Sequence, residues 1–276
     1  MPSLESRVVV ITGASAGIGA ACARELARRG CKLVLAARRV EKLEAVAGEC
    51  RGLGAEVRVV PGDVAKRGDI DRLVAATIEE FGRLDVMYAN AGYGFLAKIA
   101  DVSETQFDEI VATNVKGSWY AMQAAFEVMR KQSPLAGAPA RAARGHIILT
   151  SSGAARRGMP LYGVYSMTKA AQLSLAEAMR VEVAGTGVYV STVHPLSTAT
   201  EFFEVASSRS RIRSLGLGRS QSAEVVARKI ARLIGRPRPE LWPVFGSSLG
   251  LAFATAFPRM GDFFMRRTIG ARVRGK

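Results

Sequence analysis

Six short runs of apolar, mostly β-branched residues recur along the 276-residue chain, and longer stretches with helical spacing separate them. The runs are nearly continuous in apolar character, which is typical of strands buried on both faces of a parallel sheet. Alternating strands and helices predict right-handed βαβ units, so we expect an α/β fold: a single doubly wound parallel sheet with helices on both faces. The expected strands are 7–11, 32–36, 57–60, 84–89, 146–150 and 188–193, with a seventh at 241–245, and the expected helices are 17–29, 40–50, 69–81, 103–130, 162–184 and 222–235.

The composition is that of a folded globular protein. Apolar residues make up 49% and charged residues 23%, and no repeat or linker divides the chain, which excludes a disordered or repetitive protein. We expect one domain over residues 1–240 and an extension, apolar and then basic, over 241–276, packed on the same domain or on a partner subunit. The first residues lack a secretory signal, and Cys22, Cys31 and Cys50 have neither disulfide nor metal spacing. The sequence therefore predicts a cytoplasmic protein with reduced core thiols and no metal site.

The positive charge is concentrated near the C-terminus. The net charge is +15, and residues 209–276 hold 15 lysines and arginines against 3 acidic residues. A protein that binds nucleic acid along a groove carries its basic residues on the folded core, with aromatic residues between them. Because residues 1–208 are close to neutral, we expect no nucleic-acid partner.

A glycine-rich turn follows the first expected strand and opens the first expected helix. Gly13 suits the tight turn, Gly17 lets the backbone approach a pyrophosphate, and Gly19 lets helix and strand pack closely. The helix N-terminus attracts phosphate charge. A glycine turn also occurs without a ligand, but strand, turn and helix in this order favour a Rossmann-type dinucleotide site. Its expected loop residues are Gly13, Ser15, Gly17, Ile18 and Gly19.

The end of the second expected strand indicates which dinucleotide binds. NAD sites usually carry an acidic residue there, which accepts hydrogen bonds from the ribose 2′-hydroxyl. This chain reads Ala37-Arg38-Arg39, with no carboxylate to repel a 2′-phosphate and two guanidinium groups to bind one. The alternative is that both arginines are solvated surface charges. We expect NADP(H), with Asp63 and Val64 near its adenine ring, although an aspartate at a strand end is also a common turn or cap residue.

Tyr165 and Lys169 lie four residues apart in an expected helix, so their side chains share one face, one turn apart. An ammonium group near a phenol favours the phenolate, so we expect the pKa of Tyr165 to fall below its usual value of about 10. The spacing alone is a weak signal. Ser152 strengthens it, because this serine ends the fifth expected strand, and strand ends face the ligand crevice of open α/β sheets.

Asn114 interrupts an apolar stretch within the expected helix 103–130, which begins with the capping-box pattern of Ser103 and Gln106. Two interpretations of Asn114 have equal weight: a buried amide satisfied by backbone groups, or a role in relaying protons through water. His146 and His194 have no partner at ligand spacing, so we expect both to be structural.

With these residues in order, the sequence resembles the short-chain dehydrogenase/reductase family over about residues 6–202. The resemblance implies that Tyr165 is the acid/base, that Lys169 also holds the nicotinamide ribose, and that Ser152 binds the substrate carbonyl. It implies that Asn114 anchors a water-linked proton relay. Besides the glycine turn and Asp63, the family pattern includes Asn90, Ala91 and Gly92 and the segment from Pro195 through Thr198 to Thr200.

Two positions depart from the family pattern, because Ala89 replaces an asparagine and Leu196 replaces a glycine. Leu196 would narrow the nicotinamide side of the pocket. If the family geometry holds, Met159, Tyr162 and Phe202 border the site and indicate an apolar or aromatic substrate, although lid or interface roles are an alternative. We expect an NADP(H)-dependent carbonyl reductase or alcohol dehydrogenase. The alternatives are a 3-oxoacyl or fatty-acyl reductase of the same fold and a non-catalytic module that senses NADP(H).

The last quarter of the chain has the weakest family resemblance. Residues 241–258 form an uncharged 18-residue stretch, near the lower limit for a membrane span, but its prolines, glycines and hydroxyl residues disfavour that interpretation. We expect a last strand and a helix packed over the substrate crevice or on a partner subunit. The alternative is peripheral contact of an apolar and basic segment with an anionic membrane. The resemblance also implies a homodimer or homotetramer, paired through helices 103–130 and 162–184.

Overall fold

The computed structural model describes residues 4–196, 198–199, 221–244 and 246–273. Its centre is a seven-stranded sheet in the order β3-β2-β1-β4-β5-β6-β9, and every neighbouring pair is parallel. The strands are β1 (Val8–Thr12), β2 (Lys32–Ala36), β3 (Val57–Val59), β4 (Val86–Ala89), β5 (Gly145–Thr150), β6 (Val188–Val193) and β9 (Glu240–Leu241). The predicted doubly wound parallel sheet is confirmed.

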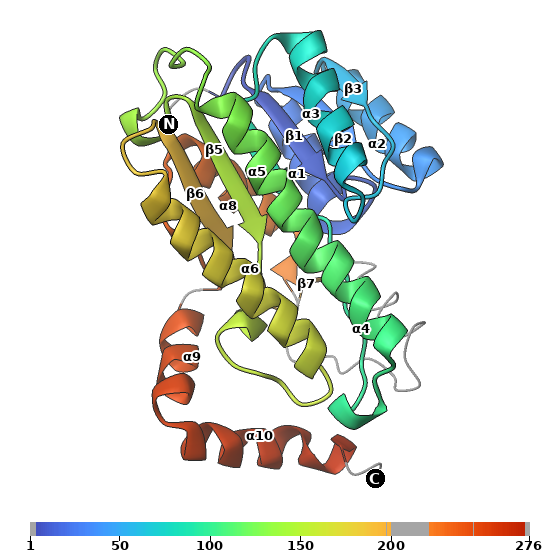
Figure 1. Ribbon diagram of the computed structural model, residues 1–276, viewed down its shortest axis with the longest axis vertical. Helices are drawn as coiled ribbons and strands as arrows, with labels where there is room; N and C mark the ends of the chain where they lie inside the picture. The colour runs from blue at the N-terminus through green and yellow to red at the C-terminus, as the bar shows by residue number, and fades with distance from the viewer. Residues whose placement is uncertain (1–3, 197, 200–220, 245, 274–276) are drawn as a thin grey trace.

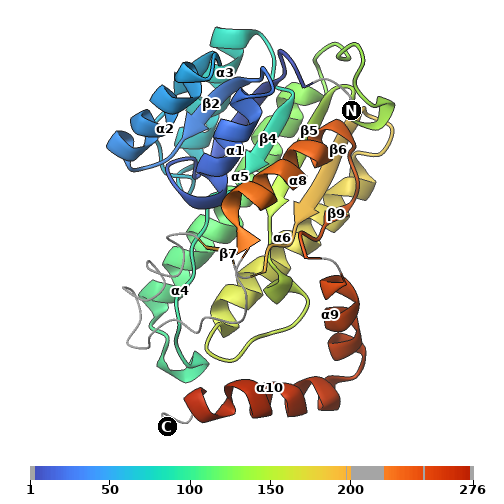
Figure 2. The same ribbon diagram turned by 180° about the vertical axis from the view of Figure 1, so that it is seen from behind.

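Helices cover both faces of this sheet. One face carries α1 (Gly17–Ala27), α2 (Val40–Gly52) and α8 (Ala223–Gly235), which are nearest the viewer in Figure 2. The opposite face carries α3 (Arg67–Phe81), α5 (Gly117–Met129) and α6 (Gly163–Glu182), in front in Figure 1. The two faces form two separate apolar clusters, so each strand residue contributes to one cluster or the other according to its parity.

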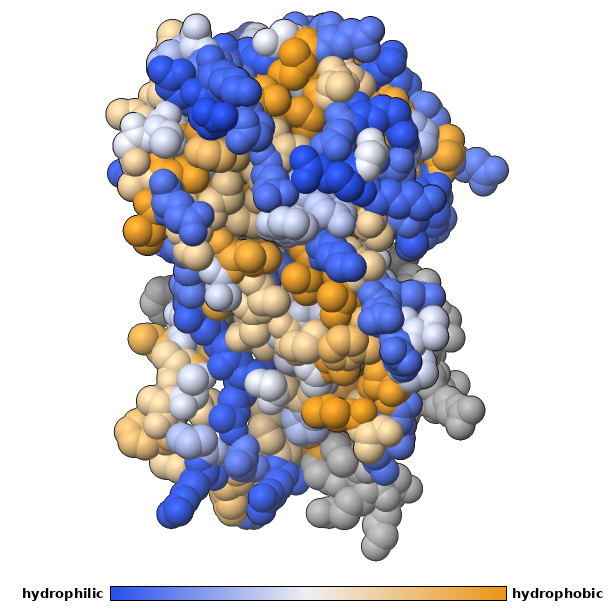
Figure 3. All heavy atoms as spheres, viewed as in Figure 1, coloured by the Kyte–Doolittle hydropathy of each residue, from blue (hydrophilic) through white to orange (hydrophobic). Residues whose placement is uncertain are grey.

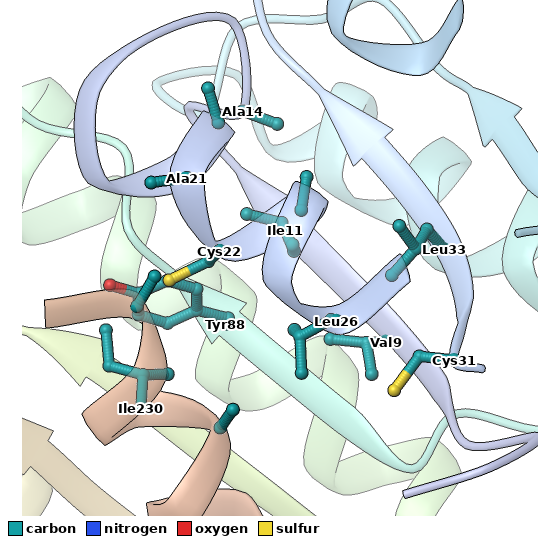
Figure 4. Close-up of a cluster of buried hydrophobic side chains, with 14 of the residues drawn as sticks. Val9, Ile11, Ala14, Ala21, Cys22, Leu26, Cys31, Leu33, Tyr88 and Ile230 are labelled. Atoms are coloured by element: carbon teal, nitrogen blue, oxygen red, sulfur yellow. The ribbon is translucent and has the colours of Figure 1, made fainter. Parts of the chain in front are cut away.

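The core shows why the strand sequences are continuously apolar. All residues of β1 and β4 are buried, because helices lie on both sides of these central strands. Figure 4 shows the first cluster, where Tyr88 of β4 lies between Cys22 of α1 and Ile230 of α8. The three cysteines are free and buried, as expected from their spacing. Burial raises the pKa of the Cys31 thiol to about 12 and that of Cys50 to about 11, so these thiols resist ionisation.

The structure corrects two expected elements. The helix expected over 103–130 is divided into α4 (Glu104–Val111), a π-helical turn (Ala112–Lys116) and α5. The capping box of Ser103 and Gln106 is confirmed at the start of α4. The seventh strand is β9 (Glu240–Leu241) rather than 241–245, because only Thr192 and Val193 of β6 pair with it. This strand crosses the boundary expected at residue 240.

The C-terminal part of the chain leaves the sheet after β9. Helix α9 (Ser247–Ala256) runs away from the main body, and α10 (Pro258–Val273) lies across the end of the molecule, below α4 and α6 in Figure 1. A short pair of strands, β7 (Thr198–Ala199) and β8 (Gln221–Ser222), precedes α8. Among the described residues no helix has both the length and the apolar character to cross a bilayer.

Candidate active site

The glycine turn is shaped by positions that exclude a side chain. Gly13 and Gly17 have φ values of +66° and +57°, in the left-handed region that favours glycine. A Cβ atom at Gly13 would lie 2.8 Å from the Cα of Ala91, and one at Gly19 would lie 2.7 Å from Nδ2 of Asn90. The turn, the start of α1 and the segment after β4 are therefore in close contact through backbone.

Hydrogen bonds fix this contact. The Oγ1 of Thr12 accepts from the backbone N–H groups of Asn90 and Ala91, both at 3.1 Å. The side chain of Asn90 donates back to the carbonyl of Thr12, also at 3.1 Å. Helix α1 has no acidic residue in its first turn, so its N-terminus presents partial positive charge to the space above the turn. Such an arrangement suits a bound phosphate.

Arg38 and Arg39 lie beside the glycine turn, directly before α2. Both are exposed, and Nη2 of Arg39 donates to Oγ of Ser15 at 3.3 Å. Arg38 forms a long ion pair with Asp63, at 3.9 Å. The Oδ1 of Asp63 also accepts from the N–H of Ala65, so this aspartate has the turn role that was its alternative interpretation. An exposed ion pair of this length contributes little to stability. Since Arg38 and Arg39 are both exposed, their guanidinium groups are accessible to a phosphate.

Ser152, Tyr165 and Lys169 are brought together by β5 and α6. Ser152 follows β5, its Oγ accepts from the N–H of Ala154 at 3.1 Å, and its side chain is hydrogen-bonded to Tyr165. Lys169 is buried, and its Nζ lies 5.6 Å from the centre of the Tyr165 ring. The ammonium group donates to the carbonyl of Thr150 at 2.8 Å and to Oε1 of Gln172 at 2.9 Å.

The expected direction of the tyrosine shift is wrong for this structure. Burial raises the pKa of Tyr165 to about 12, and the hydrogen bond with Ser152 acts in the opposite direction. Burial also lowers the pKa of Lys169 to about 7. The ammonium group points to Thr150 and Gln172 rather than to the phenol oxygen, so it does not offset the burial of Tyr165.

Asn114 lies in the π-helical turn between α4 and α5 and is fully buried. Its Oδ1 accepts from the N–H of Tyr93 at 3.0 Å, and its Nδ2 donates to the carbonyl of Tyr93 at 2.9 Å and to Thr168 at 3.0 Å. Both groups of the amide are thus satisfied. These bonds tie the segment after β4 to the start of α6.

Gln172 is a polar residue of the site that the sequence reasoning missed. It is fully buried, accepts from Lys169, and donates to the carbonyl of Asn114 at 2.8 Å and to Ser118. Lys169 and Asn114 are therefore linked through one side chain. The available signal was a glutamine three residues after Lys169, on the same helical face.

An apolar wall borders Tyr165. Its residues come from the segment after β4, the loop before α6 and the C-terminal helix α10. They include the expected Met159 and Tyr162, whose ring lies 6.1 Å from that of Tyr165, centre to centre. The members that sequence reasoning did not connect with the site are Ile269 and Met265 of α10. A helix packed over the substrate crevice was one of the two expected positions, but no local pattern specifies which residues of such a helix reach the wall.

A polar cluster lies behind Ser152. The Nδ1 of His194 lies 3.1 Å from the carbonyl oxygen of Ser152, and its Nε2 lies 3.3 Å from a carboxylate oxygen of Glu240. Trp242 stacks on the imidazole ring at 4.3 Å and donates to Glu240. The contact with His194 lowers the pKa of Glu240 to about 2. The structural role expected for His194 thus includes a bond to the backbone of Ser152.

The segment after β6 completes the expected cofactor side. Pro195 and Thr198 are buried, and Leu196 is partly exposed, with its side chain where a Cβ atom on Gly153 would lie. Thr200 and Phe202 lie outside the described residues. The expected loop residue Ile18 packs against the first apolar cluster, and Val64 contacts the backbone position of Gly117 in α5. A Cβ atom at Gly92 would lie 3.0 Å from Oδ1 of Asn114.

Comparisons with known proteins agree with this geometry. The family model described as short chain dehydrogenase matches residues 7–210. An uncharacterized oxidoreductase of Listeria innocua is 35% identical over 209 residues, which cover 75% of this chain and 80% of that protein.

Solved structures give the same result. The alcohol dehydrogenase of Thermococcus sibiricus, complexed with 5-hydroxy-NADP, is 30% identical, with a TM-score of 0.74 over 86% of this chain and 96% of its own. A short-chain dehydrogenase/reductase of Burkholderia phymatum in complex with NAD shares the fold at 24% identity, with a TM-score of 0.81 over 95% of this chain and 97% of its own. The chain is therefore a member of the short-chain dehydrogenase family, an oxidoreductase with a nucleotide-binding fold.

Proposed function

We propose that this protein is an NADP(H)-dependent oxidoreductase that interconverts a carbonyl group and an alcohol on an apolar or aromatic substrate. The proposal depends mainly on one observation: Ser152 is hydrogen-bonded to Tyr165, one helical turn from a buried Lys169, at the carboxyl end of β5. A Cβ atom at Gly92 would lie 3.4 Å from Nζ of Lys169, so this group adjoins the expected cofactor segment.

The cofactor residues fit a dinucleotide phosphate. At Gly13 and Gly19 a Cβ atom would press on the segment after β4 and on the turn itself, Gly17 has a φ of +57°, and the N-terminus of α1 adds partial positive charge. Arg38 and Arg39 are the exposed cations beside it, and Ala37 supplies no carboxylate against a 2′-phosphate. When bound, NADP(H) would supply or accept the hydride.

The side chains of this chain would handle the proton. In the reducing direction Tyr165 donates its hydroxyl proton to the substrate oxygen, and the Ser152 hydroxyl donates a hydrogen bond to the same atom. To stabilise the phenolate that forms, the Lys169 ammonium group has to turn from Thr150 and Gln172 towards the phenol oxygen, and its pKa of about 7 keeps it partly protonated at neutral pH. Gln172 accepts a hydrogen bond from Lys169 and donates one to the carbonyl of Asn114, and this chain of bonds positions the ammonium group.

The wall around Tyr165 supports the substrate class. Met159, Tyr162 and Ile269 present carbon atoms towards it, so burial of an apolar or aromatic group would supply binding energy. A 3-oxoacyl or fatty-acyl substrate remains the alternative of the same fold. A non-catalytic sensor is the alternative of another class, and it has no use for an acid/base tyrosine.

Cofactor preference is tested by the dissociation constants of NADPH and NADH, measured by fluorescence. A charge-assisted bidentate pair is worth about 1.5–3 kcal/mol, so NADPH should bind at least about tenfold more tightly. Arg38→Ala and Arg39→Ala should reduce that ratio. The matched control is Arg28→Ala, an exposed arginine at the end of α1. Equal affinities in the unmodified protein would contradict the proposal.

Turnover is tested by following NADPH oxidation with ketones, aldehydes, ketosteroids and 3-oxoacyl thioesters. Tyr165→Phe removes only the hydroxyl group, so cofactor affinity should survive while turnover falls by at least about 100-fold. Retained turnover on the best substrate would remove Tyr165 from the proposed role. Tight NADPH binding without any turnover would favour the sensor.

We also propose a homodimer or homotetramer that pairs through α4, α5 and α6. One side of α5 is buried against the sheet through Met122, Ala125 and Met129. Trp119 of α5 and Phe107 of α4 remain 42% and 40% exposed. Such large apolar side chains on neighbouring helices support an interface. Light scattering at micromolar concentration tests it, and a mass of 29.5 kDa would indicate a monomer and reject the pairing.

A further inference from the structure

Helices α9 and α10 expose a set of large apolar side chains. Leu249 is 75% exposed, and Phe263 and Phe264 are 56% and 57% exposed. Figure 3 shows apolar surface over α9 and mixed apolar and hydrophilic side chains at the lower end, where α10 lies. The exposed apolar residues of the two helices and of the position between them are Leu249, Phe253, Phe257, Met260, Phe263 and Phe264, which we call the C-terminal apolar face. The rings of Phe253 and Phe257 lie 4.8 Å apart and those of Phe263 and Phe264 5.8 Å apart, centre to centre, and exposed apolar groups gathered in this way mark an interaction surface.

Helix α10 has two apolar sides with different neighbours. Gly261, Met265 and Ile269 recur every four residues and face the protein, where Met265 and Ile269 pack on the wall near Tyr165. Met260 and Phe263, three residues apart, lie on the opposite side of the helix. Because the inner side of α10 already packs on the protein, the apolar side chains of the outer side are not needed for that contact.

Arginines flank the outer side. Arg259 and Arg266 are exposed about two turns apart on one edge, and the guanidinium of Arg267 lies 5.9 Å from the ring centre of Phe263. The only acidic residue in the sequence of α10 is Asp262, and its carboxylate pairs with Arg157. The C-terminal apolar face thus carries unneutralised positive charge.

This charge distinguishes between the possible occupants. A second copy of the chain that used this face across a two-fold axis would bring together two surfaces with the same net positive charge. Like charges placed opposite one another in an interface are unfavourable. A surface that carries negative charge above an apolar interior can pair with the arginines and also bury the apolar side chains.

We propose that the C-terminal apolar face binds to the surface of an anionic membrane. The aromatic side chains enter the boundary between headgroups and acyl chains, and the arginines remain at the level of the anionic headgroups. The attachment is peripheral and sensitive to salt, because it depends on charge. Since the inner side of α10 forms part of the wall near Tyr165, attachment would bring that site next to the lipid phase. This last link rests on the proposed function, whereas the attachment itself does not.

The test is co-sedimentation of the full chain with phosphatidylglycerol vesicles and with phosphatidylcholine vesicles at low and high salt. We expect binding to the anionic vesicles at low salt, with release at high salt and little binding to the zwitterionic ones. Arg266→Glu combined with Arg267→Glu should weaken binding by more than about 30-fold, because the variant loses two positive charges near the surface and gains two negative ones. Phe263→Ser combined with Phe264→Ser should weaken it by at least about tenfold.

Matched controls separate this surface from general charge and hydrophobicity. Arg28→Glu on α1 and Val181→Ser on α6, where Val181 is 77% exposed, should bind vesicles as the unmodified chain does. Circular dichroism and NADPH binding of each variant check the fold, and light scattering reports the oligomeric state. The proposal is overturned if the unmodified chain stays in the supernatant at low salt, or if the controls weaken binding equally. It is also overturned if the Phe263 and Phe264 changes only dissociate an oligomer.

Discussion

The main sheet and the C-terminal helices are stabilised in different ways. Every residue of β1 is buried between two layers of helices, and the large side chains of α8 are buried with it. No described residue of α9 is buried, and in α10 only Gly261 and Ile269 are buried among the side chains described. The sheet depends on a continuous core, while the C-terminal helices depend on a small cluster and a few polar contacts.

This difference indicates that one region of the chain provides stability and the other provides surface for binding. A densely packed core carries most of the free energy of unfolding, since that free energy follows buried apolar area. Elements with few buried contacts open at lower cost and are free to present side chains to a ligand or partner. We therefore expect substitutions in the sheet layers to act on global stability, and substitutions in α10 to act on the site and on binding.

The largest effect should come from Ile230→Ala in α8, compared with Ile269→Ala in α10. Both isoleucines are buried, at 0% and 2% exposure. Ile230→Ala should lower the free energy of unfolding by about 2–5 kcal/mol, because it leaves a cavity in the main core. Ile269→Ala should lower it by less than about 1 kcal/mol, because α10 opens separately. Urea denaturation measures both values. Equal losses would show that α10 belongs to the main cooperative unit.

The next effect concerns glycines. Gly19→Ala should destabilise the protein by about 1–3 kcal/mol and weaken NADPH binding, because the new Cβ would press against Asn90 and the carbonyl of Gly13. Gly250→Ala is the matched control in α9, where nothing lies within 4 Å of the added atom. It should raise stability by up to about 1 kcal/mol, since alanine favours a helix. Thermal denaturation and cofactor titration distinguish the two.

A pH-dependent effect should come from Lys169. Its pKa is lowered to about 7 by burial, from an ordinary value of 10.5, so above neutral pH the unfolded state holds a proton that the folded state lacks. The contribution of Lys169 to the free energy of unfolding should therefore rise between pH 7 and 10, by up to about 1.4 kcal/mol per pH unit. Below pH 7 both states are protonated and this contribution levels off.

The Lys169→Met variant measures that effect. The rise should be absent from urea denaturation curves of this variant recorded across the same pH range. Burial raises the pKa of Cys50 to about 11 and those of Cys31 and Tyr165 to about 12, so the unfolded state loses protons that the folded state keeps. These groups lower the free energy of unfolding at the alkaline end of the range in both proteins, and the difference between the two proteins isolates Lys169. An unchanged slope in Lys169→Met would assign it to other groups.

The smallest effect should come from Asp262→Asn. The carboxylate is 59% exposed and pairs with Arg157, so its loss should change the free energy of unfolding by less than about 1 kcal/mol. It should nevertheless speed proteolysis within α9 and α10, because this pair links α10 to the loop before α6. Glu127→Gln, which removes an exposed pair with Arg130 on α5, is the control and should leave the cleavage rate unchanged.

The sequence predicted the parts of the molecule that depend on local pattern. The parallel strands follow from continuous apolar runs, and the glycine turn follows from backbone positions that only glycine tolerates. Tyr165 and Lys169 were found because helical spacing fixes their common face. The π-helical turn at Asn114 was not predicted, since one inserted residue leaves no mark in the apolar periodicity.

Features that depend on contacts distant in sequence were beyond such reasoning. The pKa of Tyr165 is one, because the position of the Lys169 ammonium group is set by Thr150 and Gln172 rather than by its distance from Tyr165 along α6. The choice between the two positions expected for the C-terminal helix is another, because Ile269 is more than one hundred residues from Leu96 and Tyr162, which it contacts. Local periodicity carries no information about either.

The packing of α8 on α1 has a consequence for biosynthesis. Cys22, Tyr88 and Ile230 share one apolar cluster, although the first belongs to the earliest helix and the last to a helix near the end of the chain (Figure 4). A nascent chain therefore exposes the outer side of α1 until residues 223–235 have left the ribosome. During that time its apolar surface is open to aggregation and its thiols to oxidants. The nucleotide-binding half therefore becomes protected only when residues 223–235 have been released, and not when the first strands form.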